Sequence, residues 1–206
     1  MEITARELAK TYARAAKQNY ERDGHLMPVL HVVDAKGAGF TMVPNPERFG
    51  GQPREQFAAL IALTADAIET TYIGTCVEAW MKAFPAQKGV PDLERGQLSR
   101  EADKDPEIRT SIVVHVIDVR DASNTYSVMM TVKGDPRDHE YDEHEQNGVM
   151  EGGLMEALIQ GYNAACLQII PLPEGARDSV AHRMQFLGSV DFIAAALYTE
   201  EIDRDG

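Results

Sequence analysis

The chain has 206 residues, of which 44% are hydrophobic, and its formal net charge is −13 at pH 7. This length and apolar content suit one ordinary domain, so we expect a single domain over residues 1–206 that folds without disulfides or a structural metal. The excess of carboxylates repels phosphates and anionic lipid headgroups, which disfavours direct binding of nucleic acid or membranes.

The sequence also predicts a location in the cytoplasm. Acidic residues occur early in the chain without a following apolar stretch, which is unlike a signal peptide. No apolar run approaches the ~18 residues that a spanning helix needs. Cys76 and Cys166 lie far apart in the sequence, so we expect two small, buried thiols in a reducing compartment.

The N-terminal half alternates between helical and strand patterns. Thr4 and Glu7 have capping-box spacing, which predicts a helix ending near Gly24. Residues 26–34 and 38–43 flank turn residues and predict a β-hairpin. A second helix is predicted to begin at Pro53, with its core-facing positions at helical spacing: Phe57, Leu60, Ile61, Thr64, Ala67, Ile68 and Thr71.

The later segments combine strands, polar loops and a helical C-terminus. The pattern predicts strands over residues 72–81, 110–119 and 125–133. It predicts loops over residues 84–107 and 134–153, the second of them acidic, and a charged tail over 199–206. Helical spacing recurs between Leu154 and Leu197.

This order of elements predicts an α+β fold. Short turns join antiparallel neighbours directly, so we expect a mostly antiparallel sheet of about five strands, covered by helices and followed by a helical C-terminus.

The middle of the chain resembles a known pattern. A strand carrying Glu78-Ala79-Trp80, a polar loop ending in residues 105–109 and an apolar strand over 112–117 are similar to small, uncharacterised bacterial and phage α+β proteins. The similarity covers roughly residues 28–132. It implies this order of elements and carries over no activity and no catalytic residue.

An acidic segment contains the candidate metal ligands His139, Glu143 and His144. Imidazole and carboxylate groups are suitable ligands for zinc, manganese or iron. The two histidines are five residues apart, which places them on diverging faces of a helix and on opposite faces of a strand. Only a loop brings them together, and the alternative is a solvated acidic loop.

Two further residues could take part in proton transfer. Glu78 lies within a predicted strand beside Trp80, and His115 lies in an apolar strand. If the two strands align these side chains, each changes the pKa of the other, and the pair is suited to acid–base chemistry. Otherwise Glu78 faces water and His115 is a core histidine with its hydrogen bonds satisfied.

Other motifs give little support to catalysis. His31, His182 and His25 read as ordinary structural residues, and Cys76 has no basic neighbour in sequence that would lower its pKa. Phosphate-loop and nucleophile-elbow motifs are absent from the sequence. Trp80 and Phe84, at the edge of the long loop, are candidate anchors for a protein partner, although core packing explains Trp80 equally well.

Two hypotheses of function remain. The first is an acidic interaction or regulatory protein that is not an enzyme, has no cofactor and binds a protein partner. The second is a hydrolase that uses a divalent metal bound by His139, Glu143 and His144. Apolar positions between Leu154 and Leu197 also predict homo-oligomerisation.

Overall fold

The computed structural model describes residues 2–43, 53–81, 105, 107–121, 123–133, 140–148, 153–168 and 195–198, the side chains of 53–56, 153 and 195–198 excepted. Three α-helices and a short 3₁₀-helix are described: α1 (Ala5–Asp23), α2 (Pro53–Thr64), η1 (Ala65–Ala67) and α4 (Gly153–Cys166). The strands are β1 (Val29–Val33), β2 (Gly39–Met42), β3 (Tyr72–Met81), β4 (Arg109–Asp118), β5 (Thr125–Lys133), β6 (Glu140–Asn147) and β7 (Ala195–Tyr198).

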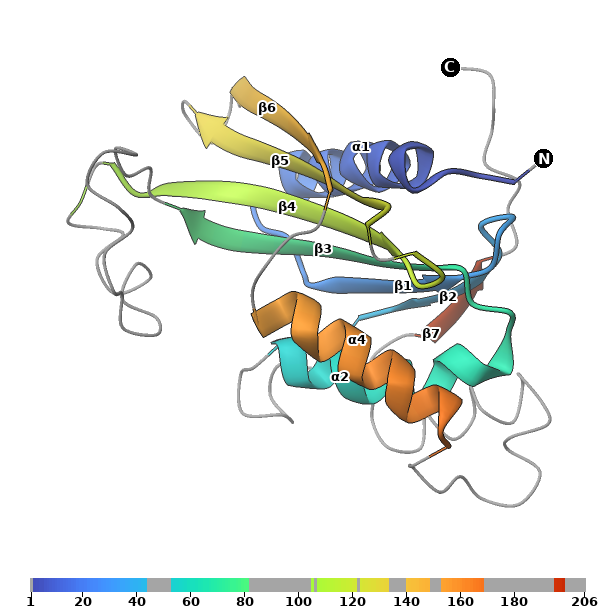
Figure 1. Ribbon diagram of the computed structural model, residues 1–206. Helices are drawn as coiled ribbons and strands as arrows, with labels where there is room; N and C mark the ends of the chain where they lie inside the picture. The colour runs from blue at the N-terminus through green and yellow to red at the C-terminus, as the bar shows by residue number, and fades with distance from the viewer. Residues whose placement is uncertain are drawn as a thin grey trace.

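The strands form one sheet in the order β6-β5-β4-β3-β1-β2-β7, and every neighbouring pair is antiparallel. Helix α1 packs on β3, β4 and β5 on one face of this sheet, while α2 and α4 lie together on the other face (Figure 1). The protein is therefore an α+β fold with a helix layer on each side of an antiparallel sheet, as the sequence predicts.

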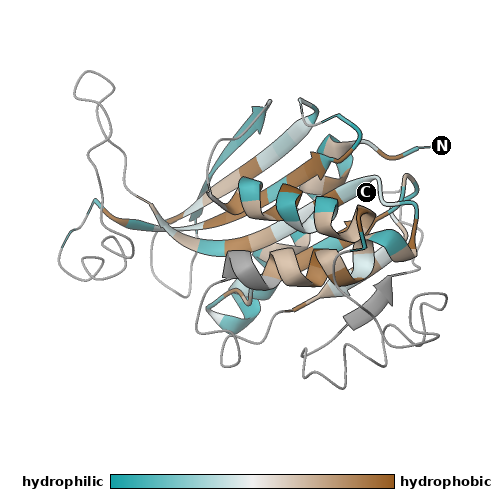
Figure 2. Ribbon diagram, turned by 60° about the horizontal axis from the view of Figure 1, so that its bottom comes forward, coloured by the Kyte–Doolittle hydropathy of each residue, from teal (hydrophilic) through white to brown (hydrophobic). Residues whose placement is uncertain are grey.

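Alternation along the strands divides the core into two parts. Ile112, Val114 and Val116 of β4 pack against α1, whereas Ile73 of β3 and Ile117 of β4 belong to the cluster beneath α2 and α4. Hydrophobic residues are concentrated in the strands between the helices (Figure 2). The central strands are apolar on both faces because helices cover both faces.

Helix α1 begins and ends as its sequence predicts. The Thr4 hydroxyl accepts a hydrogen bond from the Glu7 backbone N–H at 3.2 Å, and the Glu7 carboxylate accepts one from the Thr4 N–H at 2.8 Å. Gly24 ends the helix in the left-handed conformation, with φ of 74°. Two of the backbone donors at the start of the helix, those of Thr4 and Glu7, are thus satisfied within the capping box itself.

Two glycines permit close packing. A Cβ atom on Gly161 of α4 would lie 2.6 Å from the carbonyl oxygen of Ala58 on α2, so the two helices touch through their backbones. A Cβ atom on Gly74 of β3 would lie 2.7 Å from the Tyr12 ring of α1. Each position excludes any larger residue unless its neighbour moves.

Two expectations need correction. The predicted acidic loop over residues 134–153 contains β6, so six strands precede α4, where about five were expected. Tyr141 is the only large apolar side chain of β6, and an edge strand needs little burial, which is why hydrophobic alternation does not reveal it. The helical C-terminus is confirmed for α4, but Ala195–Tyr198 form β7. Residues 82–104 and 169–194 lie outside the described residues. Among the described helices, none is long and apolar enough to cross a membrane.

Candidate functional site

The candidate metal ligands of β6 diverge. Glu143 pairs with Met130 and has the same parity as Glu145, which contacts α1; His144 pairs with Met129 and faces the opposite side. On that side the His144 Nε2 atom lies 3.7 Å from an oxygen of Asp142. His139 lies outside the described residues. Within the described ranges no group of three or more His, Cys, Asp or Glu side chains is placed to hold a metal ion.

Glu78 and His115 also face opposite sides of the sheet. The register pairs Glu78 with Ile112 and His115 with Thr75. A Glu78 oxygen accepts a hydrogen bond from the Leu26 backbone N–H at 3.0 Å, on the α1 side. The two side chains therefore cannot form the acid–base pair that an alignment of their strands would have allowed.

His115 belongs instead to a row of polar side chains on the face of the sheet that α2 and α4 cover. Its Nδ1 atom lies 2.9 Å from the hydroxyl oxygen of Ser127, the residue opposite on β5. Thr75, opposite on β3, is fully buried, and its hydroxyl has no hydrogen-bond partner among the described residues. Burial lowers the pKa of His115 to about 4, so the imidazole is neutral at neutral pH.

A serine beside a neutral imidazole resembles a nucleophile with its base. An active pair also needs access for substrate and a third group that orients the base. His115 is only 6% exposed, and its recorded neighbours in the row are hydroxyl groups. The arrangement therefore acts as a cross-strand polar contact. The sequence alone does not reveal Ser127 as the partner, because the contact depends on strand register.

A second histidine, partly buried, lies on the α1 face. His31 stacks on the Tyr12 ring with a centroid separation of 3.8 Å, and its Nδ1 atom is 3.0 Å from the Thr41 hydroxyl oxygen. Its Nε2 atom lies 4.0 Å from the Cys76 sulfur. Burial lowers the pKa of His31 to about 3 and raises that of Cys76 to about 12. The thiol is therefore protonated at neutral pH, which agrees with the prediction that Cys76 is no nucleophile. Cys166, which was also expected to be buried, is exposed.

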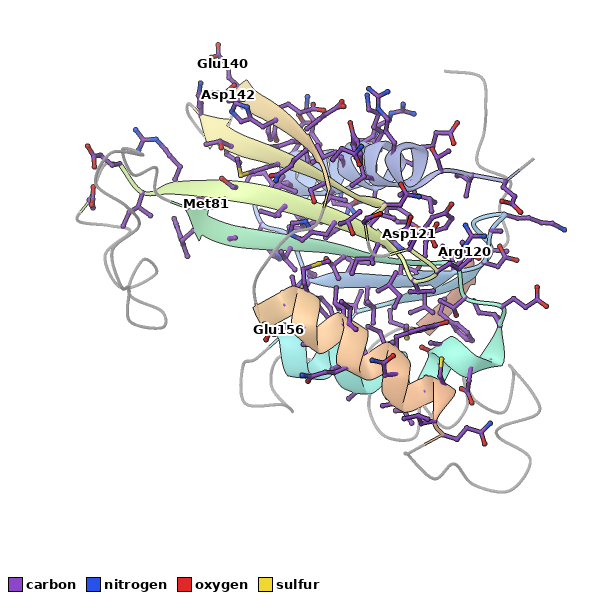
Figure 3. All side chains as sticks on the ribbon, viewed as in Figure 1. Met81, Arg120, Asp121, Glu140, Asp142 and Glu156 are labelled. Carbon is purple, nitrogen blue, oxygen red and sulfur yellow. The ribbon has the colours of Figure 1, made fainter. Side chains whose placement is uncertain are left out.

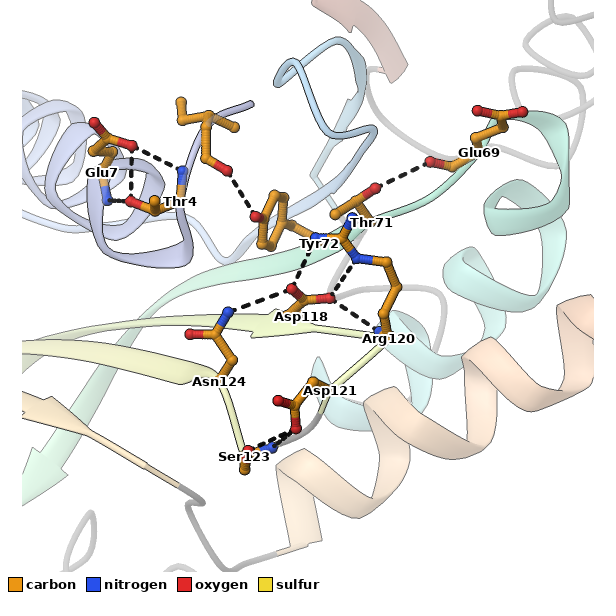
Figure 4. A network of polar contacts seen from close by, with 11 residues as sticks. Thr4, Glu7, Glu69, Thr71, Tyr72, Asp118, Arg120, Asp121, Ser123 and Asn124 are labelled. Carbon is orange, nitrogen blue, oxygen red and sulfur yellow. Dashed lines mark hydrogen bonds and ion pairs between the residues drawn. The ribbon is translucent and has the colours of Figure 1, made fainter. Parts of the chain in front are cut away.

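The turn between β4 and β5 holds a dense ion-pair network (Figure 4). The Arg120 Nε and Nη2 atoms donate to the two oxygens of Asp118, each at 3.0 Å, and the Asn124 amide donates at 3.4 Å. Burial acts to raise the pKa of Asp118, but the hydrogen bonds from Arg120 outweigh it and the pKa is lowered. Because its oxygens already accept hydrogen bonds from Arg120 and Asn124, Asp118 stabilises the turn and is not free to bind a substrate.

A small cavity of about 110 Å³ lies between this turn and α4. Its walls are largely aliphatic, including Ile73, Ile117 and Leu158, with Asp118 of β4 and Tyr162 and Asn163 of α4 as polar members. A space of this size holds a few water molecules or a small aliphatic group.

Strand β6 is fastened to α1 by one carboxylate. The Glu145 carboxylate forms ion pairs with Lys10 Nζ at 2.6 Å and with Arg6 Nη2 at 3.4 Å. It also accepts a hydrogen bond from the Tyr126 hydroxyl. The hydrogen bond from Lys10, followed by that from Tyr126, lowers the pKa of Glu145 to about 2. Glu145 is thus a structural residue. Glu140 and Glu143 differ from it in having no ion pair or hydrogen bond within the part of the chain that the structure describes.

The candidate partner-binding residue Trp80 is accessible. Its residue surface is 42% exposed, and that of the adjacent Met81 is 37% exposed, so core packing does not account for Trp80. Met81 is the last residue of β3, and Glu140 and Asp142 of β6 lie near the same end of the sheet (Figure 3). Phe84 lies outside the described residues.

Comparison with known proteins returned no match among protein families, curated proteins or solved structures.

Proposed function

We propose that this chain is an acidic accessory or regulatory protein of bacterial or phage type that binds a basic protein partner in the cytoplasm without catalysing a reaction. The observation that supports this proposal is β6. In the described sheet this strand has a neighbour, β5, on one side only. All of its side chains except Tyr141 are exposed, and four of them are carboxylates. Glu145 pairs with Lys10 and Arg6, and Asp142 pairs with Lys133 at 3.0 Å, whereas Glu140 and Glu143 have no ion pair among the described residues.

The physical basis is charge complementarity. The exposed carboxylates of β6, which lie on both faces of the strand, belong to a protein of net charge −13; they steer cationic surfaces toward the strand and repel anionic ones. Extended segments also bind to open sheet edges through backbone hydrogen bonds. The alternative, a metal-dependent hydrolase, would need Glu143 and His144 to turn toward one ion, whereas they occupy opposite faces of β6.

The test is binding of a fluorescently labelled peptide of alternating arginine and serine, followed by anisotropy over a salt series. A glutamate–serine peptide of the same length is the reference probe. We expect the cationic peptide alone to bind, with affinity falling as salt increases. The Glu140→Gln/Glu143→Gln variant should bind more weakly than the wild type. The matched Glu69→Gln/Glu156→Gln variant, with the same change in net charge, should bind as the wild type does. Equal binding of both peptides, or no loss in the β6 variant, would refute the proposal.

A further inference from the structure

Trp80 lies on the same face of the sheet as α1. It is the only tryptophan of the chain, and it pairs with Thr110 in the register of β3 and β4. The register of β4 and β5 pairs Ser111 with Thr131, and continuing it by one residue places Thr110 opposite Val132. Val132 in turn pairs with Tyr141 of β6. Trp80 and β6 therefore occupy one row, about 14 Å apart at a usual strand spacing of about 4.8 Å.

Trp80 has a carboxylate beside it. Glu78 is its neighbour on this face, two residues earlier in β3, and is held by the Leu26 N–H at 3.0 Å. Glu78 also lies close enough to Tyr20, in the last turns of α1, that its charge adds to burial in raising the pKa of Tyr20. Helix α1 ends nearby, and the C-terminal end of a helix carries partial negative charge, while the Asp23 carboxylate at this end is paired with Arg22.

From these positions we infer that Trp80 and Glu78 form a subsite for a lysine or arginine side chain of the basic partner. This inference rests on the proposed function. An exposed indole face attracts a cation through its quadrupole, and a carboxylate beside it adds direct charge attraction.

The local charge selects this occupant over others that would also use an exposed tryptophan. A nucleic acid could stack a base on Trp80, and a membrane could accept its ring at the headgroup level. Both bring phosphate groups toward Glu78 and the end of α1, where repulsion opposes them. A cationic side chain gains from both the ring and the carboxylate.

The experiment uses the same labelled arginine–serine peptide on the full chain. Trp80→Leu keeps an apolar side chain and removes the aromatic ring, while Glu78→Gln removes the charge and keeps an oxygen that can accept from Leu26. Each should weaken binding about twofold to fivefold at low salt. Leu167→Ala, at an exposed apolar residue beyond α4, is the control and should leave affinity unchanged. Circular dichroism checks that each variant is folded.

Emission of Trp80 provides a second readout, because no other tryptophan contributes. Saturation with the cationic peptide should change the Trp80 emission and protect it from acrylamide quenching. Wild-type affinity in both Trp80→Leu and Glu78→Gln would overturn the subsite, as would protection by a single-stranded oligonucleotide or by anionic vesicles in place of the peptide. If the cationic peptide still binds and only the β6 variant weakens it, the subsite fails while the proposed function stands. If the peptide does not bind at all, the proposed function fails too.

Discussion

Acidification should destabilise the fold through His115. The folded protein holds this imidazole neutral, with a pKa of about 4, because it is buried at 6% exposure. In the unfolded chain an imidazole has a pKa of about 6.5 and binds a proton more readily. The stabilising effect of the neutral form is therefore complete above the unfolded pKa, is lost progressively as the pH falls below it, and reaches its limit at the folded pKa.

The magnitude follows from proton linkage. Between about pH 6.5 and pH 5, an imidazole that protonates only on unfolding lowers the free energy of unfolding by about 2 kcal/mol. His31 acts in the same direction, since burial lowers its pKa to about 3. Part of the His31 surface stays accessible, so we assign it a smaller effect than that pKa implies. Asp118 and Glu145, whose pKa values are lowered, add to acid destabilisation mainly at still lower pH.

The assay is urea unfolding followed by far-ultraviolet circular dichroism at about pH 7 and about pH 5. His115→Gln removes the titrating group, and we expect it to lose about 2 kcal/mol less than the wild type between the two conditions. The control is His144→Gln, at an exposed position on β6, which should lose as much as the wild type. Comparing losses within each protein removes the cost of the substitution itself. An unchanged pH dependence in His115→Gln would refute the assignment.

Three further predictions concern packing, thiol access and assembly. Gly161→Ala should lower the free energy of unfolding by about 1–3 kcal/mol because its new methyl group meets α2. The control Gln160→Ala, on the exposed side of α4, should not lower it. Urea unfolding tests this, and equal stability of Gly161→Ala and the wild type would contradict the close contact. A thiol reagent should label Cys166 in the native protein and Cys76 only in denaturant; native labelling of both would show that Cys76 is accessible. The apolar surface of α4, with Leu167 72% exposed just beyond its end, predicts self-association, which Leu167→Ser should weaken in sedimentation velocity; a wild-type monomer at high concentration would exclude it.

Local patterns in the sequence predict much of this fold. Thr4 and Glu7 interact within one helical turn, so their spacing alone indicates the start of α1. The apolar runs of β3 and β4 indicate central strands because both faces are covered. These features depend on contacts between residues close in the chain, or on the average burial of an element.

The candidate sites were harder to predict because they depend on register. Glu78 and His115 lie on adjacent strands, but a shift of one residue in the strand register decides whether their side chains share a face or lie on opposite faces. Glu143 and His144 are successive residues of β6, so their side chains also lie on opposite faces. The exposure of Trp80 depends on where α1 ends relative to β3, which no periodicity within either element specifies.

The carboxylates of β6 also bear on which chains this protein can approach. An open strand is a general template for pairing, including pairing with the same edge of a second copy. Here a second copy would place Glu140, Asp142 and Glu143 against carboxylates of the same kind, at a cost for every pair brought together. The charge of the edge thus determines which strands can join it: it resists edge-to-edge pairing of identical molecules while staying open to a strand of opposite charge.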